Sequence, residues 1–145
     1  MNVILRLPFL PPSANEAYRR NQWGGMTLSA KAKVFITAAK LQINRQLDGT
    51  VLFDPNRAHS IHLHFRSPTL LNKGWETGKA ATRFKKFDVA NLEKLLSDLV
   101  CEVFGIDDSC IVRNTQSKSL GKAGTIIVLT ELPDSAFLED DSDEG

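Results

Sequence analysis

The chain has 145 residues, of which 42% are hydrophobic, enough for one domain with a core and too few for two. The net charge is only +1, but six of the 17 acidic residues lie in the last twelve positions. Residues 1–133 therefore carry all 18 lysines and arginines against 11 acids, a surplus that suits a polyanionic partner. The sequence contains no membrane-length apolar stretch, secretory signal or glycine-rich nucleotide fingerprint, which argues against membrane and nucleotide-hydrolysing classes.

The predicted elements follow the order β-α-β-α-β-β. Strands are expected at Val3–Leu7, Ser60–Phe65, Cys110–Ser119 and Thr125–Thr130, and helices at Ser29–Leu47, where Val34, Ala38 and Leu41 have helical spacing, and from about residue 89 to 104. This order predicts a single α+β domain over residues 1–133, a mixed sheet with two helices packed on it. We expect residues 134–145 to be a disordered acidic tail, which either keeps the chain soluble or competes with DNA for the basic body.

Two histidines and two cysteines give little sign of a zinc site. His62 and His64 share one face of their predicted strand, but two ligands are too few, and Cys-x-x-Cys is absent. We expect the histidines to line a sheet face or a subunit interface. Cys101 and Cys110 fit a reduced, cytoplasmic setting.

A basic segment without clear periodicity, residues 71–86, precedes the second helix. It contains Gly74, Gly78 and Trp75, and its cations are Lys73, Lys79, Arg83, Lys85 and Lys86. This composition is typical of a long mobile loop, and we favour a DNA-contacting role over a merely solvated insertion. Trp75 could stack on an exposed base or simply pack on the domain surface.

The second helix has an apolar face and a polar stripe beside it. At about 100° per residue, with Asn91 at zero, an apolar sector between roughly 40° and 140° holds Leu92, Leu95, Leu96, Leu99 and Val103. Asn91, Lys94 and Asp98 fall at roughly 300° to 360°, next to that sector. The plain interpretation is Asp88 as helix N-cap and a Lys94–Asp98 surface pair, worth a few tenths of a kcal/mol.

A second acidic element follows the helix and changes this interpretation. Gly105 is suited to end the helix, and Asp107 and Asp108 lead into the next strand. Carboxylates that converge on one point bind Mg²⁺, which keeps its other positions for water and phosphate. Whether Asp108 reaches the Asp88 end of the helix depends on the direction of that strand, which the sequence does not fix.

The residues resemble the RusA-type Holliday-junction resolvases, homodimeric Mg²⁺-dependent endonucleases that cut four-way DNA junctions. Leu7 to Arg20 is similar to the family's opening strand and Pro-Pro-Ser-x-Asn turn, with a helix following near Thr27–Ser29. Residues 88–108 are similar to its Asp-x-Asp-Asn-x-x-Lys-x-x-x-Asp…Asp-Asp signature.

The resemblance implies a role for each matching residue. Asp88 and Asp108, with Asp107 beside it, would hold Mg²⁺ or Mn²⁺, Lys94 would stabilise charge on the phosphate, and Asn91 and Asp98 would support the site. We expect the DNA to be bound by the loop cations together with Arg19 and Arg20. The resemblance also implies a homodimer, with one site for each of two strands in a symmetric junction.

Ala90 stands where the family has its second aspartate. A methyl group cannot coordinate Mg²⁺, so we expect this chain to cut poorly or not at all. Three explanations are open: an inactivating substitution introduced to trap DNA, which we favour because the other motif residues remain; a natural member that takes a ligand from elsewhere; and a degenerate binding protein. Two further classes also stay open, a non-catalytic structure-specific DNA-binding module and a protein-interaction domain.

Overall fold

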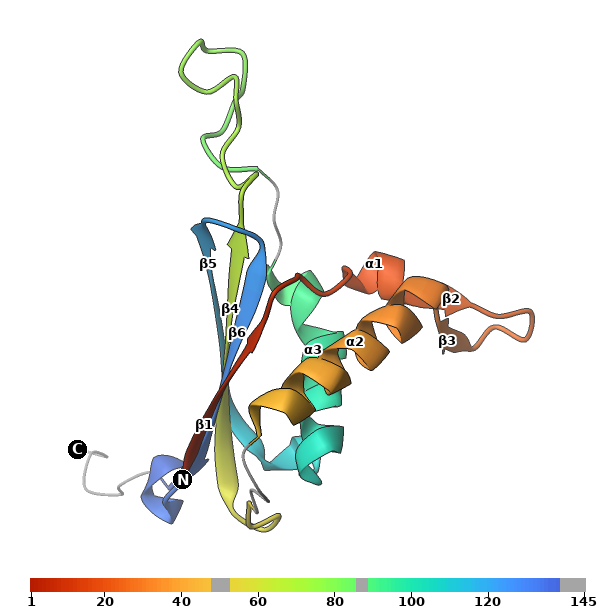
Figure 1. The fold of residues 1–145 in the computed structure, drawn as a ribbon, viewed down its shortest axis with the longest axis vertical. Coiled ribbons are helices and arrows are strands. Elements are labelled where there is room, and N and C mark those ends of the chain that lie inside the picture. The colour runs from red at the N-terminus through yellow and green to blue at the C-terminus, as the bar shows by residue number, and fades with distance from the viewer. Residues whose placement is uncertain (48–52, 86–88, 139–145) are drawn as a thin grey trace, which may run out of the picture.

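The structure is a computed structural model that describes residues 1–47, 53–85 and 89–138. Within these residues, a four-stranded sheet consists of β1 (Asn2–Leu7), β6 (Gly124–Leu132), β4 (Ala58–Ser67) and β5 (Ile111–Leu120), in that spatial order. The helices α2 (Ala30–Gln46) and α3 (Val89–Phe104) cover one face of this sheet, and the short α1 (Ala14–Ala17) lies beside them (Figure 1). The predicted mixed sheet with helices packed on it is confirmed.

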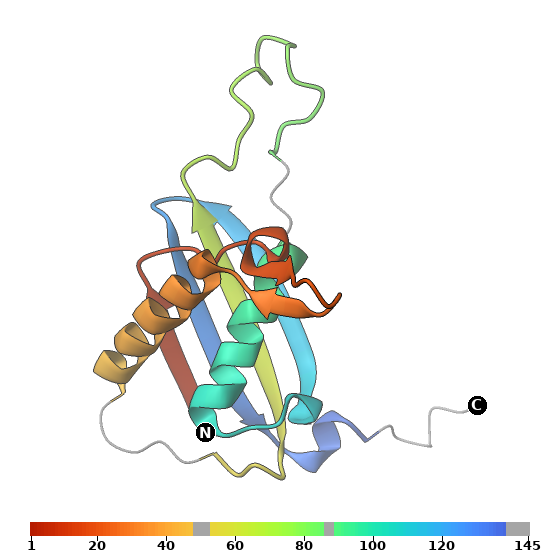
Figure 2. The ribbon, with the colours of Figure 1, turned by 90° about the vertical axis from the view of Figure 1, so that its right-hand side faces the viewer.

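The direction of β5 is set by a crossover connection. β6 is antiparallel to both β1 and β4, whereas β4 and β5 are parallel. Parallel neighbours cannot be joined by a tight turn, so residues 71–85 and α3 carry the chain from the end of β4 back to the start of β5 (Figure 2). β5 therefore begins near the C-terminal end of α3, after the short 3-10 helix η1 (Asp108–Cys110).

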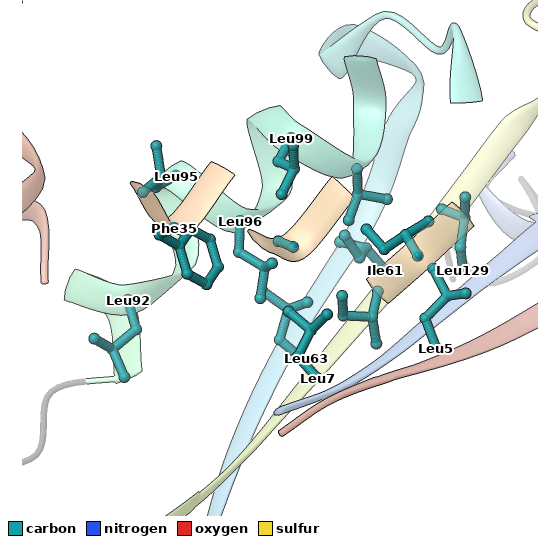
Figure 3. Close-up of a cluster of buried hydrophobic side chains, with 14 of the residues drawn as sticks. Leu5, Leu7, Phe35, Ile61, Leu63, Leu92, Leu95, Leu96, Leu99 and Leu129 are labelled. Atoms are coloured by element: carbon teal, nitrogen blue, oxygen red, sulfur yellow. The ribbon is translucent and has the colours of Figure 1, made fainter. Parts of the chain in front are cut away.

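The core lies between the sheet and the two long helices. Leu96 of α3 and Ile61 and Leu63 of β4 are fully buried, and Phe35 of α2 packs with them (Figure 3). The apolar face predicted for the second helix is confirmed, because Leu92, Leu95, Leu96 and Leu99 are all buried. The helix ends at Gly105, whose φ of 66° is costly for residues with a Cβ.

The helix α2 buries a different stripe from the residues whose spacing predicted it. Ser29 caps α2 at its N-terminus, close to the predicted start, but Val34 is 70% exposed and Leu41 50% exposed. The buried residues are Ala32, Phe35, Ala39 and Ile43. Hydrophobic spacing does not reveal this stripe, because two of its four members are alanines. Alanine allows a helix to pack closely against neighbouring elements, but it is only weakly hydrophobic.

Three elements between residues 14 and 28 were not predicted. These are α1 and the two strands β2 (Tyr18–Arg20) and β3 (Met26–Leu28), which form a separate hairpin. Strands of three residues are too short for alternation to reveal them. Ser13 is the N-cap of α1, and its hydroxyl accepts the Glu16 N–H at 3.3 Å and donates to the Glu16 carboxylate at 3.2 Å.

The sheet face away from the helices carries the two histidines. The rings of His62 and His64 hydrogen-bond to hydroxyls on β5, His62 to Thr115 at 2.6 Å and His64 to Ser117 at 2.6 Å and Ser119 at 2.8 Å. They therefore share one sheet face, as predicted.

The acidic tail falls partly outside the described residues. Asp134–Ala136 form a 3-10 turn, and residues 139–145 lie outside the described range, so the disorder expected of the tail stays a prediction. Among the described helices, none combines the length and apolar character needed to cross a membrane.

Adjacent residues of α2 test which of its faces is buried. We expect Phe35→Ala to lower the free energy of unfolding by about 3–5 kcal/mol, because it leaves a cavity where Phe35 meets Phe9 with ring centroids 5.6 Å apart. Val34→Ala should change it by no more than about 0.5 kcal/mol, because Val34 is exposed. Urea denaturation of both variants measures the difference, and equal losses would contradict the assignment of the buried face.

Candidate active site

A cavity of about 180 Å³ lies between α3 and the start of β5. Its lining includes the predicted site residues Lys94, Asp98 and Asp108. The rest of the lining consists of Glu93, Ser97, Cys101, Ile111 and Asn114. On the helical wheel used above, the α3 members occupy about 200° to 340°, the sector next to the buried leucines. Burying the leucines against the sheet therefore turns this sector toward β5.

The negative charge of Asp108 acts on the Asp98 carboxyl at the cavity. Burial raises the pKa of the Asp98 carboxyl, the Lys94 ammonium lowers it, and the negative charges of Asp108 and Glu93 raise it further. Burial, together with Asp108, Asp98 and Asp107, also raises the pKa of the Cys101 thiol to about 11. The cavity is thus a place where negative charge gathers in a partly dehydrated setting.

Lys94 is held by an aromatic ring from the hairpin. Its ammonium lies 5.3 Å from the centroid of the Tyr18 ring, a cation–π contact. Burial raises the pKa of the Tyr18 hydroxyl, and the charges of Asp98 and Glu93 raise it as well. Tyr18 therefore borders the site, although the sequence analysis gave it no role, and no sequence signal links a residue of β2 to a lysine in α3.

Glu93 and Asn114 are two further site residues that the sequence analysis did not single out. The Glu93 carboxylate accepts hydrogen bonds from the Asn114 amide at 2.6 Å and the Ser97 hydroxyl at 2.7 Å. Asn114 in turn accepts from Gln116 at 2.5 Å. This network ties the polar side of α3 to β5. The wheel could have indicated Glu93, because it lies one residue before Lys94 on the same half of the helix.

Asp107 has a structural function in the turn after α3. Its side chain accepts the Ser109 N–H at 2.9 Å and caps η1. Hydrogen bonding to the Ser109 side chain, and then to its backbone N–H, lowers the pKa of the Asp107 carboxyl. This cap fixes the turn that presents Asp108 to the cavity.

Several predicted residues fall at or beyond the edge of the described chain. Asp88 and Lys86 lie outside the described residues, and of Ala90 and Asn91 only the helical backbone is described. Among the described residues, no group of three His, Cys, Asp or Glu side chains is arranged to hold a metal ion. The structure thus brings together Lys94, Asp98 and Asp108 but does not describe how Asp88 relates to them.

The position of Asp108 along α3 can be stated. The charge of Asp108 acts on Asp98 and Cys101, which both lie in the C-terminal half of the helix, although the cavity also extends to Lys94. Val89, the first residue of α3, lies nine residues before Asp98, about 13 Å along the axis at 1.5 Å per residue. The direction of β5, which the sequence left open, therefore places η1, whose first residue is Asp108, away from the start of α3 within the chain. Figure 2 shows β5 beginning near the C-terminal end of α3.

The basic segment before α3 projects from the end of β4 and closes on itself at its base (Figures 1 and 2). Asn72 and Arg83 pair through their backbones at 2.9 Å, and the Asn72 side chain donates to the carbonyls of Thr82 and Phe84. The side chains of Lys73, Lys79, Arg83 and Lys85 are exposed. A cavity of about 420 Å³ at the base of this arm is lined by Trp75 and three of these cations. Arg19 and Arg20, the other predicted DNA contacts, are exposed on β2.

The electrostatics of the cavity can be tested by titrating Asp98. We expect Asp108→Asn to lower the pKa of Asp98, because it removes a nearby negative charge, and Lys94→Met to raise it. Because folding raises this pKa, Asp98 favours the folded state most at low pH, and that stabilisation is lost as the pH rises through the folded pKa. Carboxyl NMR shifts against pH measure both changes, and an Asp98 pKa that neither substitution moves would place Asp108 and Lys94 away from it.

Comparison with known proteins identifies the family of the chain. Residues 8–130 match the family model described as Endodeoxyribonuclease RusA. The search of curated proteins finds no match. The match begins directly after β1, continues into β6 and includes all the residues that line the cavity. The chain belongs to the RusA endodeoxyribonuclease family.

Proposed function

We propose that this chain binds four-way DNA junctions, that cleavage by its fold depends on Mg²⁺ or Mn²⁺, and that Ala90 impairs that cleavage here. Membership of the RusA family itself implies a junction-cleaving endonuclease that resolves Holliday junctions. The observation that carries the finer proposal is the convergence of Lys94, Asp98 and Asp108 on one cavity.

The donor set at this cavity suits a hard divalent cation. Carboxylate oxygens are the ligands that Mg²⁺ takes from proteins. Burial, together with the negative charges of Asp108 and Glu93, raises the pKa of Asp98, and a bound cation would offset both effects. Such an ion polarises a phosphodiester and lowers the pKa of a bound water. We assign Asp108 and Asp88 to the ion, Asp107 to the turn beside it, and Asp98 and Asn91 to support.

Lys94 has the position of a phosphate-binding group. Its ammonium lies at the cavity, and the Tyr18 ring holds it from one side without consuming its hydrogen-bond donors. It can therefore donate to phosphate oxygens as negative charge develops on them.

We expect DNA that extends beyond the cavity to contact two basic projections of the chain. The exposed cations Lys73, Lys79, Arg83 and Lys85 lie on the arm at the end of β4, and Arg19 and Arg20 lie on the hairpin. Lys86 belongs to the same set but lies outside the described residues. Contacts of this kind hold phosphates without reading sequence.

Restoring the missing carboxylate tests the metal-dependent part of the proposal. We expect Ala90→Asp to raise Mg²⁺-dependent cutting of a four-way junction by about a hundredfold or more, since even outer-shell partners of a metal are worth 10–100-fold. Ala90→Asn is the matched control, because it has the same shape without the charge, and it should stay inactive. Cleavage is followed with end-labelled junctions over a range of Mg²⁺ and Mn²⁺ concentrations. Equal inactivity of both variants would count against the proposed metal site.

A second candidate function follows from Ala90 itself. A chain that lacks one carboxylate can keep the basic surface and bind junctions without cutting them. Junction binding without cleavage would be supported if Ala90→Asp stays inactive while the unmodified chain still prefers a four-way junction to duplex DNA.

The homodimer has a geometric argument in its favour. Asp108 lies beside the C-terminal half of α3, whereas Asp88 directly precedes its first residue. Metal–oxygen bonds to Mg²⁺ are only about 2.0–2.1 Å long, so a helix span of about 13 Å is too long for one ion. We infer that the two carboxylates meet across a two-fold axis, which requires the start of α3 in one subunit to lie beside the C-terminal half of α3 in the other, with the two helices antiparallel. The exposed edge of β5 is free among the described residues to pair with its copy in that arrangement.

Subunit complementation tests this arrangement. In the Ala90→Asp background, Asp88→Asn and Asp108→Asn should each abolish cutting. A heterodimer of the two, purified through two different affinity tags, should regain one intact site. It should therefore nick one strand of the junction and bind one Mn²⁺ in calorimetry. If the heterodimer neither cuts the junction nor binds Mn²⁺, like the two single-variant homodimers, then each subunit supplies all the carboxylates of its own site.

A further inference from the structure

The hairpin of β2 and β3 ends in an exposed tryptophan. Trp23 is 83% exposed, the largest exposed fraction among the large hydrophobic side chains that the structure describes. It stands at the tip of a ribbon that projects sideways from the helices, away from the direction taken by residues 71–85 (Figure 1). Nothing in the fold explains an indole at this position, because it contributes no burial to the core.

The tip holds Trp23 in a fixed place. The Asn21 side chain accepts hydrogen bonds from the backbone N–H groups of Trp23 at 3.0 Å and Gly25 at 2.9 Å. The backbone N–H of Asn21 donates to the Gly25 carbonyl at 2.7 Å. Gly24 takes a φ of 81° that closes the turn. A side chain on an ordered turn loses less entropy when it binds than one on a loose loop.

The base of the hairpin is also fixed and adjoins the candidate site. Ser29 donates to the Glu16 carbonyl at 2.6 Å and its N–H to the Ala17 carbonyl at 2.8 Å, which ties the exit of β3 to α1. Tyr18, the first residue of β2, contacts Lys94 through its ring. The hairpin therefore leads from the proposed phosphate-binding lysine to Trp23.

The charge of the hairpin indicates what it binds. Between Tyr18 and Leu28 there are two arginines and no acid, and both arginines are exposed. An exposed indole beside guanidinium groups suits a ligand that offers aromatic faces and phosphates together. Bases of intact duplex are stacked on one another, whereas bases at a branch point can leave the stack and meet an aromatic side chain.

We propose that Trp23 stacks on an unstacked base at the centre of a four-way DNA junction, with Arg19 and Arg20 on the adjoining phosphates. This inference rests on the proposed function and adds a basis for junction selectivity that the carboxylate site does not supply. A second copy of the chain is the other occupant that could cover the indole, and the test below separates the two.

Trp23 and Trp75 are the two tryptophans of the chain, which allows each to be observed alone. Trp75→Phe leaves Trp23 as the fluorophore, and Trp23→Phe leaves Trp75. We expect a four-way junction to quench Trp23 strongly and a duplex of equal length to quench it little. The fluorescence of a 2-aminopurine placed at the branch point should change when the Trp75→Phe protein binds. The fluorescence of the same base analogue placed within an arm should not change.

Affinity gives the second measurement. At one fixed salt concentration, Trp23→Ala should weaken junction binding about tenfold or more and leave duplex binding unchanged, since one stacked base is worth that much. Trp23→Phe, which keeps an aromatic face, should stay within about threefold. Because Trp23 is exposed, these variants should keep the melting temperature of the unmodified chain.

Three results would overturn the inference. These are unchanged junction affinity in Trp23→Ala, equal losses for junction and duplex, and light scattering that shows Trp23→Ala as a monomer where the unmodified chain is a dimer. If the unmodified chain itself fails to prefer junction over duplex, the proposed function fails as well. If it prefers the junction and Trp23 has no effect, only the present inference fails.

Discussion

The packing of α3 on the sheet is the constraint on which the rest of the site depends. Leu96 and Leu99 are buried against β4, and a helix relates its residues rigidly by about 100° each. Burying the leucines therefore fixes the direction of Lys94 and Asp98 without any interaction of their own. Loss of this packing would release the site even if each polar residue were kept.

The crossover from β4 to β5 decides which carboxylates can meet. Because β4 and β5 are parallel, the chain must return along α3 before β5 begins, and this puts Asp108 beside Asp98 rather than beside the start of the helix. A fold with an antiparallel β5 would have placed the same residues differently. The separation of Asp108 from the start of α3 is thus a property of strand direction, and it is the reason why we propose an ion shared between two subunits.

The two projections from the body suit a branched ligand better than a straight one. The arm at the end of β4 and the β2–β3 hairpin leave the molecule in different directions, and both carry exposed cations without being part of the core (Figures 1 and 2). Each has an internal hydrogen-bond network, through Asn72 in the arm and Asn21 in the hairpin. Bending a duplex costs free energy, whereas the arms of a junction already diverge, so projections in two directions are in keeping with the junction ligand that we propose.

Elements with local signals could be predicted from the amino-acid sequence. The strands of the main sheet, the leucine face of α3, the start of α2 at Ser29 and the turn at Gly105 all follow from periodicity and capping, which depend on neighbours a few residues away. The motif around residues 88–108 also identified the RusA family, which the match over residues 8–130 confirms. Only the tertiary structure decided which side of α2 is buried, that Tyr18 and Glu93 join the site, and that Asp108 lies beside Asp98. These facts depend on how strands pair and helices cross, and residues far apart in the chain carry no local signal of the contacts they will make.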